Sequence, residues 1–159
     1  MRASVLLVIS FVSGCCIGPG HDVRQFFTGH VVSTKPAASA LVGVYAVSVD
    51  RREGVKTPGS VTLLLNGDGT LSIAGDATRI FEFANGSGKG TWALQQLDAD
   101  RVWGVNIVVD HTANESSFES WYVLQKNDGT YELGQFYDDP DSGYIVELKR
   151  VATPTTAPN

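Results

Sequence analysis

Short apolar runs separated by explicit turn sequences constrain the fold of this chain more than any other feature. Asn66-Gly67-Asp68-Gly69 lies between the runs Val61–Leu65 and Thr70–Ile73, and Asn127-Asp128-Gly129 lies between the runs Trp121–Lys126 and Tyr131–Tyr137. Gly, and to a lesser extent Asn and Asp, accept the positive φ angles that tight hairpin turns need. Such spacing predicts antiparallel strands joined by hairpins.

The same pattern continues through residues 40–151, where no segment has a convincing helical period. Alternation supports strands, since Trp103, Val105, Ile107 and Val109 fall on one face of their run. We predict strands at Leu41–Val49, Val61–Leu65, Thr70–Ile73, Arg79–Ala84, Gly90–Leu97, Val102–Val109, Trp121–Lys126, Tyr131–Tyr137 and Tyr144–Val151. About eight strands at this spacing form either a sandwich or an up-and-down barrel, and a barrel leaves no exposed edges. We therefore expect an all-β fold with one antiparallel up-and-down barrel.

The N-terminus has the features of an export signal. Arg2 is followed by an apolar run over residues 5–12, which is too short to cross a bilayer as a helix. Val12-Ser13-Gly14-Cys15 resembles the bacterial lipobox, in which the chain is cut before a Cys that receives fatty-acid chains such as palmitate. The resemblance implies a signal peptide at residues 1–14 and lipidation of Cys15. An ordinary secretory signal is the alternative.

The segments on either side of the barrel have other compositions. Residues 15–39 mix Gly, Pro and Ser, so we expect a tether, with a possible short helix in which Phe26 and Phe27 share a face. This tether is either a plug over a barrel end or a flexible spacer. Residues 152–159 are rich in Pro, Thr and Ala and are expected to be a disordered tail.

In Gram-negative lipoproteins an Asp after the lipidated Cys signals inner-membrane retention. Here Cys16 follows, which implies the outer membrane, facing the periplasm.

Several motifs together resemble small bacterial lipocalin-like proteins. They are Leu41-Val42-Gly43-Val44-Tyr45, Leu65-Asn66-Gly67-Asp68-Gly69-Thr70, Gly88-Lys89-Gly90-Thr91-Trp92 and Asp139-Pro140-Asp141-Ser142-Gly143. The first motif has Tyr45 where lipocalins usually have Trp. The resemblance covers roughly residues 40–150, and it implies a barrel rather than an activity.

Charge and motif spacing disfavour several classes of function. The formal net charge of −5 disfavours a nucleic-acid or phosphate-binding surface. Gly86-Ser87-Gly88-Lys89-Gly90 lacks the spacing of a phosphate-binding loop. His111, Glu115 and Glu119 are four apart and would be metal ligands on a helix, but Asp110–Ser120 is interpreted as a solvated loop between strands. We predict no enzyme, metal or cofactor.

Two functions are considered, and binding of a small ligand is placed ahead of protein interaction. The barrel could bind a small apolar ligand at a site lined by Tyr45, Trp92, Trp103 and Trp121, although a core filled by side chains is favoured. Alternatively, a filled barrel could be a protein-interaction or inhibitor module. In that case the acidic residues Asp138, Asp139 and Asp141 would face a basic partner protein.

Overall fold

The structure is a computed structural model, and it describes residues 26–51, 61–75, 88–97, 101–112, 115–136 and 144–151. Within these residues the chain forms β-strands and one short 3-10 helix. In chain order they are β1 (His30–Val31), η2 (Ala38–Leu41), β2 (Gly43–Asp50), β3 (Thr62–Leu65), β4 (Thr70–Ala74), β5 (Gly88–Leu97), β6 (Val102–Thr112), β7 (Glu115–Gln125), β8 (Tyr131–Phe136) and β9 (Ile145–Val151). The predicted all-β class is confirmed.

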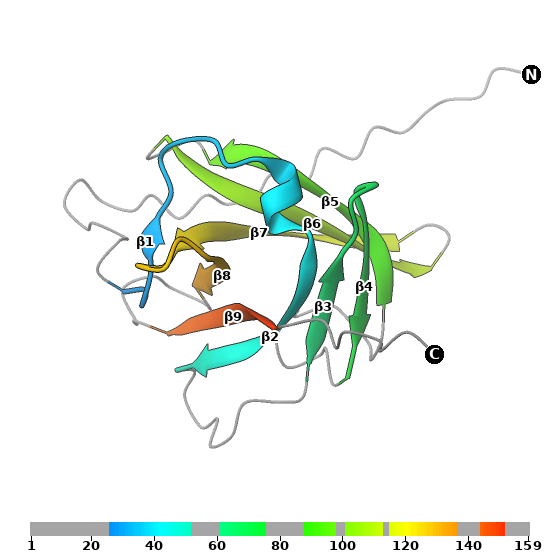
Figure 1. The fold of residues 1–159 in the computed structure, drawn as a ribbon. Coiled ribbons are helices and arrows are strands. Elements are labelled where there is room, and N and C mark those ends of the chain that lie inside the picture. The colour runs from blue at the N-terminus through cyan, green and yellow to red at the C-terminus, as the bar shows by residue number, and fades with distance from the viewer. Residues whose placement is uncertain are drawn as a thin grey trace, which may run out of the picture.

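Strands β2 to β9 form a closed barrel. Each strand pairs antiparallel with the next one in sequence, and β9 also pairs with β2, where Tyr45 lies opposite Arg150. These eight strands surround the centre of the molecule in Figure 1, and β1 lies outside the ring. The predicted up-and-down barrel is therefore confirmed, and it is compatible with the lipocalin-like resemblance.

Two hairpins at one end of the barrel are built from the same Asp-Gly-Thr sequence. Asp68 accepts hydrogen bonds from the backbone N–H (2.9 Å) and the hydroxyl (2.7 Å) of Thr70. Asp128 accepts the same pair from Thr130, at 2.9 and 2.6 Å. These bonds stabilise the carboxylates and lower the pKa of both Asp side chains. Gly69 and Gly129 have φ values of 83° and 82°, which side chains rarely allow.

The strand boundaries differ from the prediction mainly at β7. The predicted loop Asp110–Ser120 is wrong, because β6 continues to Thr112 and β7 already begins at Glu115. The Ser residues of β7 are tolerated here because they lie opposite β6 residues in the ladder, as Ser117 does opposite Val109, and the register shifts only between Asp110 and Thr112. The predicted strand Arg79–Ala84 lies outside the described residues.

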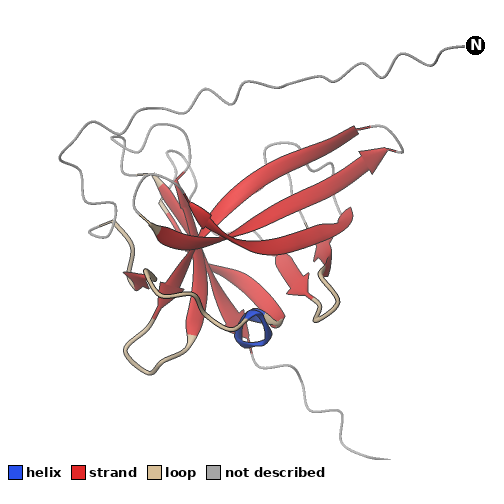
Figure 2. Ribbon diagram, turned by 90° about the horizontal axis from the view of Figure 1, so that it is seen from above, coloured by secondary structure: helices blue, strands red, loops and turns tan. Residues whose placement is uncertain are grey.

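The segment before the barrel packs against it. Residues 26–29 form a turn and bends, and residues 22–25 of the predicted short helix lie outside the described residues. Val32 and Leu41 are buried in the barrel core. In Figure 2 the helix η2 lies at one end of the barrel, where the tan loops between strands also turn. Residues 32–42 therefore cover that end.

The core has two parts, on opposite sides of the barrel wall. The main cluster fills the interior with side chains from the barrel strands, among them Tyr45, Leu65, Trp92, Trp121 and Leu133. A smaller cluster lies outside the wall and is the buried set Phe27, Val31, Val102, Leu124 and Ile145. Because successive strand residues point to opposite faces, β7 contributes Val123 to the interior and Leu124 to the outer cluster.

Candidate functional site

The barrel interior was the predicted ligand site, and its inward side chains are closely packed. Tyr45, Leu65, Trp121, Val123 and Leu133 have no solvent-accessible surface. A cavity wide enough for a ligand would leave accessible surface on the side chains that line it. The interior around these residues is therefore filled by the chain's own side chains.

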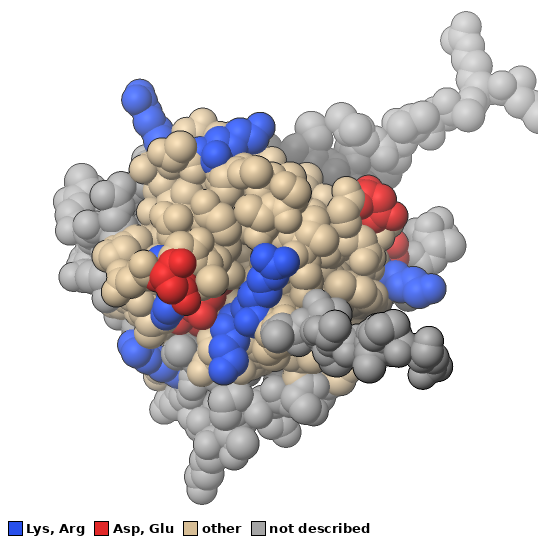
Figure 3. All heavy atoms as spheres, in the orientation of Figure 1, with Lys and Arg blue, Asp and Glu red and all other residues tan. Residues whose placement is uncertain are grey.

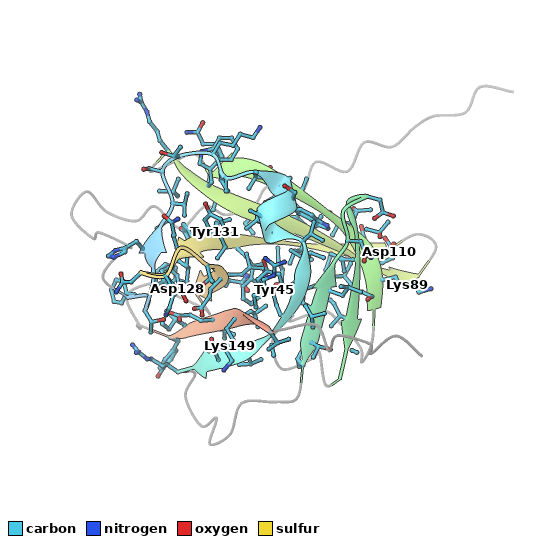
Figure 4. The ribbon with its side chains drawn as sticks, viewed as in Figure 1. Tyr45, Lys89, Asp110, Asp128, Tyr131 and Lys149 are labelled. Carbon is cyan, nitrogen blue, oxygen red and sulfur yellow. The ribbon has the colours of Figure 1, made fainter. Side chains whose placement is uncertain are left out.

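Tyr45 is fully buried in this packed interior, and Figure 4 places it inside the ring of strands. Its hydroxyl donates a 2.8 Å hydrogen bond to the Leu41 carbonyl oxygen, at the end of η2. Burial raises the pKa of Tyr45 to about 12, since the phenolate would be poorly solvated, and the nearby Arg150 charge opposes this only in part. Tyr45 thus joins the barrel wall to the segment that covers its end.

The three tryptophans have different surroundings. Trp92 is nearly buried, and its indole N–H donates to the Asn66 carbonyl oxygen at 2.9 Å. Trp121 is fully buried and donates to the Glu119 carboxylate at 3.2 Å. Trp103 is half-buried, with the Lys35 ammonium group 5.1 Å from the ring centroid. Tyr45, Trp92 and Trp121 belong to the packed interior, and Trp103 lies outside both buried clusters.

Two polar side chains on β7 face the interior and were not predicted. Ser117 lies opposite Val109, and Glu119 lies opposite Ile107. Both are 9% exposed. Among the described residues, the Ser117 hydroxyl has no hydrogen-bond partner. Sequence alone missed this pair because a stretch rich in Ser and Glu is typical of a solvated loop.

The four-residue spacing of His111, Glu115 and Glu119 falls on strands and not on a helix. His111 and Glu115 lie on the paired strands β6 and β7, and Glu119 is farther along β7. On a strand, four residues span about 13 Å, so Glu115 and Glu119 are not adjacent as they would be on a helix. Among the described residues, no group of three His, Cys, Asp or Glu side chains could hold a metal ion.

A polar network fastens the N-terminal segment to the outside of the barrel. Glu147 on β9 is fully buried. Its carboxylate accepts hydrogen bonds from the backbone N–H (2.6 Å) and the hydroxyl of Thr28. Lys126 donates to the Thr28 hydroxyl at 3.0 Å and lies 3.5 Å from the Glu132 carboxylate. These charged contacts compensate for burying Glu147.

Aromatic side chains surround this network. The Phe27 ring lies 5.6 Å from Tyr122 and 5.0 Å from Phe136, between ring centroids. Gly134 allows this approach, since a Cβ atom there would lie 2.7 Å from the Phe27 ring. The described part of the expected tether, from Phe26 onward, is thus packed on the barrel wall. The arrangement fastens this segment to the barrel wall.

The remaining predicted site residues, Cys15, Asp138, Asp139 and Asp141, lie outside the described residues. No family model matches the chain, and no curated protein is similar to it at a significant level. In the described part of the chain, no helix has the length and apolar character of a membrane span.

Proposed function

We propose that this chain is a lipid-anchored protein of the bacterial envelope whose filled barrel acts as a protein-interaction module. The observation that supports this most is the absence of accessible surface on inward side chains such as Tyr45, Trp121 and Leu133. Where the described interior is filled in this way, recognition of a partner falls to the surface and the loops.

The anchor in this proposal is Cys15, at the end of the lipobox-like sequence. The chain from Cys15 to Phe26 can span at most about 40 Å when fully extended. Because Phe26 and Phe27 pack on the outer cluster, the barrel would stay within that distance of the outer membrane, on the periplasmic side. More than one acyl chain is needed for stable anchoring.

The partner in this proposal is a protein with a basic surface. The densest acidic stretch of the sequence stands between β8 and β9 and contains Asp138, Asp139 and Asp141. The whole chain has a net charge of −5. Among the described residues, Figure 3 shows acidic and basic side chains scattered over one face of the barrel, without a wide patch of one sign. An acidic stretch of this kind would speed the encounter with a basic partner and make it sensitive to salt.

The alternative function is a carrier of a small apolar ligand bound among Tyr45, Trp92, Trp103 and Trp121. It would require packed side chains to separate, at the cost of their contacts. Native mass spectrometry and tryptophan quenching against a panel of lipids test both functions. We expect no co-purifying ligand and no quenching. A stoichiometric lipid with quenching of the buried indoles would favour the carrier and contradict the filled module.

Anchoring and partner contact have separate tests. Labelled palmitate should be incorporated in the wild type and in Cys16→Ala, and lost in Cys15→Ala, which should leave the membrane fraction. Equal labelling of the two variants would exclude Cys15 as the acceptor.

Asp138→Asn/Asp141→Asn should weaken pull-down of a basic envelope protein and reduce its salt dependence. An unchanged yield at all salt concentrations would argue against the acidic contact.

A further inference from the structure

Strand β5 is longer than the neighbour that pairs with it on one side. Its pairing with β4 covers only Gly88 to Thr91, and the last bond runs from the Trp92 N–H to the Gly69 carbonyl oxygen at 2.8 Å. On the other side, pairing with β6 continues to Leu97. Beyond Trp92, therefore, β5 has a partner strand on only one side within the described chain.

The backbone groups on the open side can be assigned. Residues of a strand direct their N–H and C=O groups alternately to the two neighbours. The Trp92 N–H donates toward the β3–β4 hairpin. Leu94 and Gln96 therefore direct their backbone N–H and C=O groups to the same side, whereas those of Ala93 and Gln95 bond to β6. No strand of the described chain pairs there. Leu94 is half-buried and Gln96 is exposed, so the edge reaches the surface.

This edge lacks three of the features by which natural proteins prevent strand addition, namely charged residues, Pro and a bulge. The sequence Thr91-Trp92-Ala93-Leu94-Gln95-Gln96-Leu97 has no charge and no Pro, and its pairing with β6 is regular. The charged residues of the β5–β6 pair, Lys89 and Asp110, lie opposite each other away from this stretch (Figure 4).

The same end of the barrel already accepts an added strand elsewhere. Beside the first residues of β6, the chain at β1 lies against β7, with His30 opposite Gln125. The Val32 N–H donates to the Val123 carbonyl oxygen at 3.0 Å, and the Trp103 N–H donates to the Val32 carbonyl oxygen at 2.8 Å. An extended segment thus bridges β6 and β7 where the two strands separate. At the corresponding position beside Leu94 and Gln96, no backbone segment of the described chain is paired.

We propose that the free edge of β5, at Leu94 and Gln96, binds an extended peptide segment of a partner protein by β-strand addition. The two residues offer two donors and two acceptors, enough for four backbone hydrogen bonds, and the neutral edge suits an uncharged peptide. This rests on the proposed role as an interaction module. A second copy fits less well, since about five paired residues bury less than the roughly 800 Å² per partner of a stable complex.

Amide hydrogen exchange tests the free edge in the full-length protein. The Leu94 and Gln96 amides should exchange at least about tenfold faster than those of Ala93 and Gln95, which bond to β6. Protection of Leu94 and Gln96 equal to that of their neighbours would show that the edge is already covered and would overturn the proposal.

Peptide binding tests the partner. Peptides selected from a displayed library of random heptapeptides should slow exchange at Leu94 and Gln96. Gln96→Pro removes an outward N–H without removing a ladder bond, and should weaken binding roughly tenfold. Gln96→Ala, the matched control, keeps the N–H and should stay within about threefold of wild type. If Gln96→Pro does not fold, the exchange pattern of the wild-type complex decides.

Three outcomes overturn the edge assignment: no peptide is selected, peptides bind both variants equally, or binding leaves exchange at Leu94 and Gln96 unchanged. Concentration-dependent dimerisation abolished by Gln96→Pro would assign the edge to a second copy instead. These failures are distinct from failure of the proposed function. Lipid quenching, Cys15 labelling and the salt-dependent pull-down do not depend on this edge.

Discussion

At the scale of single residues, Tyr45 shows how a polar atom is accommodated in a packed barrel. Its ring is fully buried, and its hydroxyl reaches the Leu41 carbonyl oxygen just before the chain enters β2. A buried hydroxyl without a partner would cost free energy, so the end of η2 supplies an acceptor. Tyr stands where the resemblance to lipocalins leads one to expect Trp, and the hydroxyl has its own structural role.

Replacing Tyr45 with Phe should lower the free energy of unfolding by about 1–2 kcal/mol at neutral pH, because the Leu41 carbonyl loses its donor. The pKa of Tyr45 is raised from 10.0 to about 12. Wild-type stability should therefore fall as pH rises from about 10 to 12, where the unfolded chain releases the proton and the native state keeps it. Denaturant titrations at pH 7 to 12 measure both effects.

Tyr131→Phe is the control, because it leaves the Tyr45 hydroxyl in place. Its free energy of unfolding should still fall between about pH 10 and 12, and this fall should be smaller in Tyr45→Phe. An identical pH dependence in Tyr45→Phe and wild type would show that Tyr45 does not titrate between these values.

At the scale of elements, the segment from Phe26 to Val31 acts as an outer strap on the barrel. It pairs with β7 through β1 and covers the buried Glu147 through Thr28. Phe27 and Val31 complete the outer cluster. The sequence suggested either a plug or a spacer here, and the described part packs as a covering element, because its aromatic side chains bury area against Tyr122 and Phe136.

Removing the Thr28 hydroxyl should loosen this strap. Thr28→Ala takes one hydrogen-bond donor from a fully buried carboxylate, so we expect a loss of about 1–3 kcal/mol in the free energy of unfolding. Thr28→Ser keeps the hydroxyl, so its free energy of unfolding should be close to that of the wild type. Chemical denaturation measures the three proteins. If Ala and Ser variants are equally stable, the hydroxyl does not support Glu147.

At the scale of the whole molecule, the closure of eight strands into a barrel also sets how much space its interior has to fill. Eight strands leave an interior just wide enough for side chains or for one small ligand. Here large residues from most strands meet in one continuous cluster. The polar pair Ser117 and Glu119 is the exception within this interior, and both side chains are held among apolar neighbours.

Leu133→Ala tests whether the interior is filled. The side chain is fully buried, so its truncation should lower the free energy of unfolding by 2–5 kcal/mol and leave an apolar cavity. Val108→Ala, which removes a half-buried side chain on the outer face, should cost less than about 1 kcal/mol. Xenon should bind the Leu133 variant and not the wild type. A small loss, or xenon in the wild type, would indicate an existing cavity.

The sequence alone determined the barrel class, most strands and the two Asp-Gly-Thr hairpins, because alternation and turn chemistry are local properties. It also placed Trp103, Val105, Ile107 and Val109 on one face of β6. It missed the start of β7, since Ser117 and Glu119 look like loop residues until the ladder with β6 and the buried interior are known.

Only the tertiary structure decided which aromatic residues share the interior, that Glu147 is covered by Thr28, and that β5 extends past β4 with a free edge. These features depend on where the barrel closes and on the relative lengths of paired strands. Both are set by contacts between residues far apart in sequence, which no local pattern encodes.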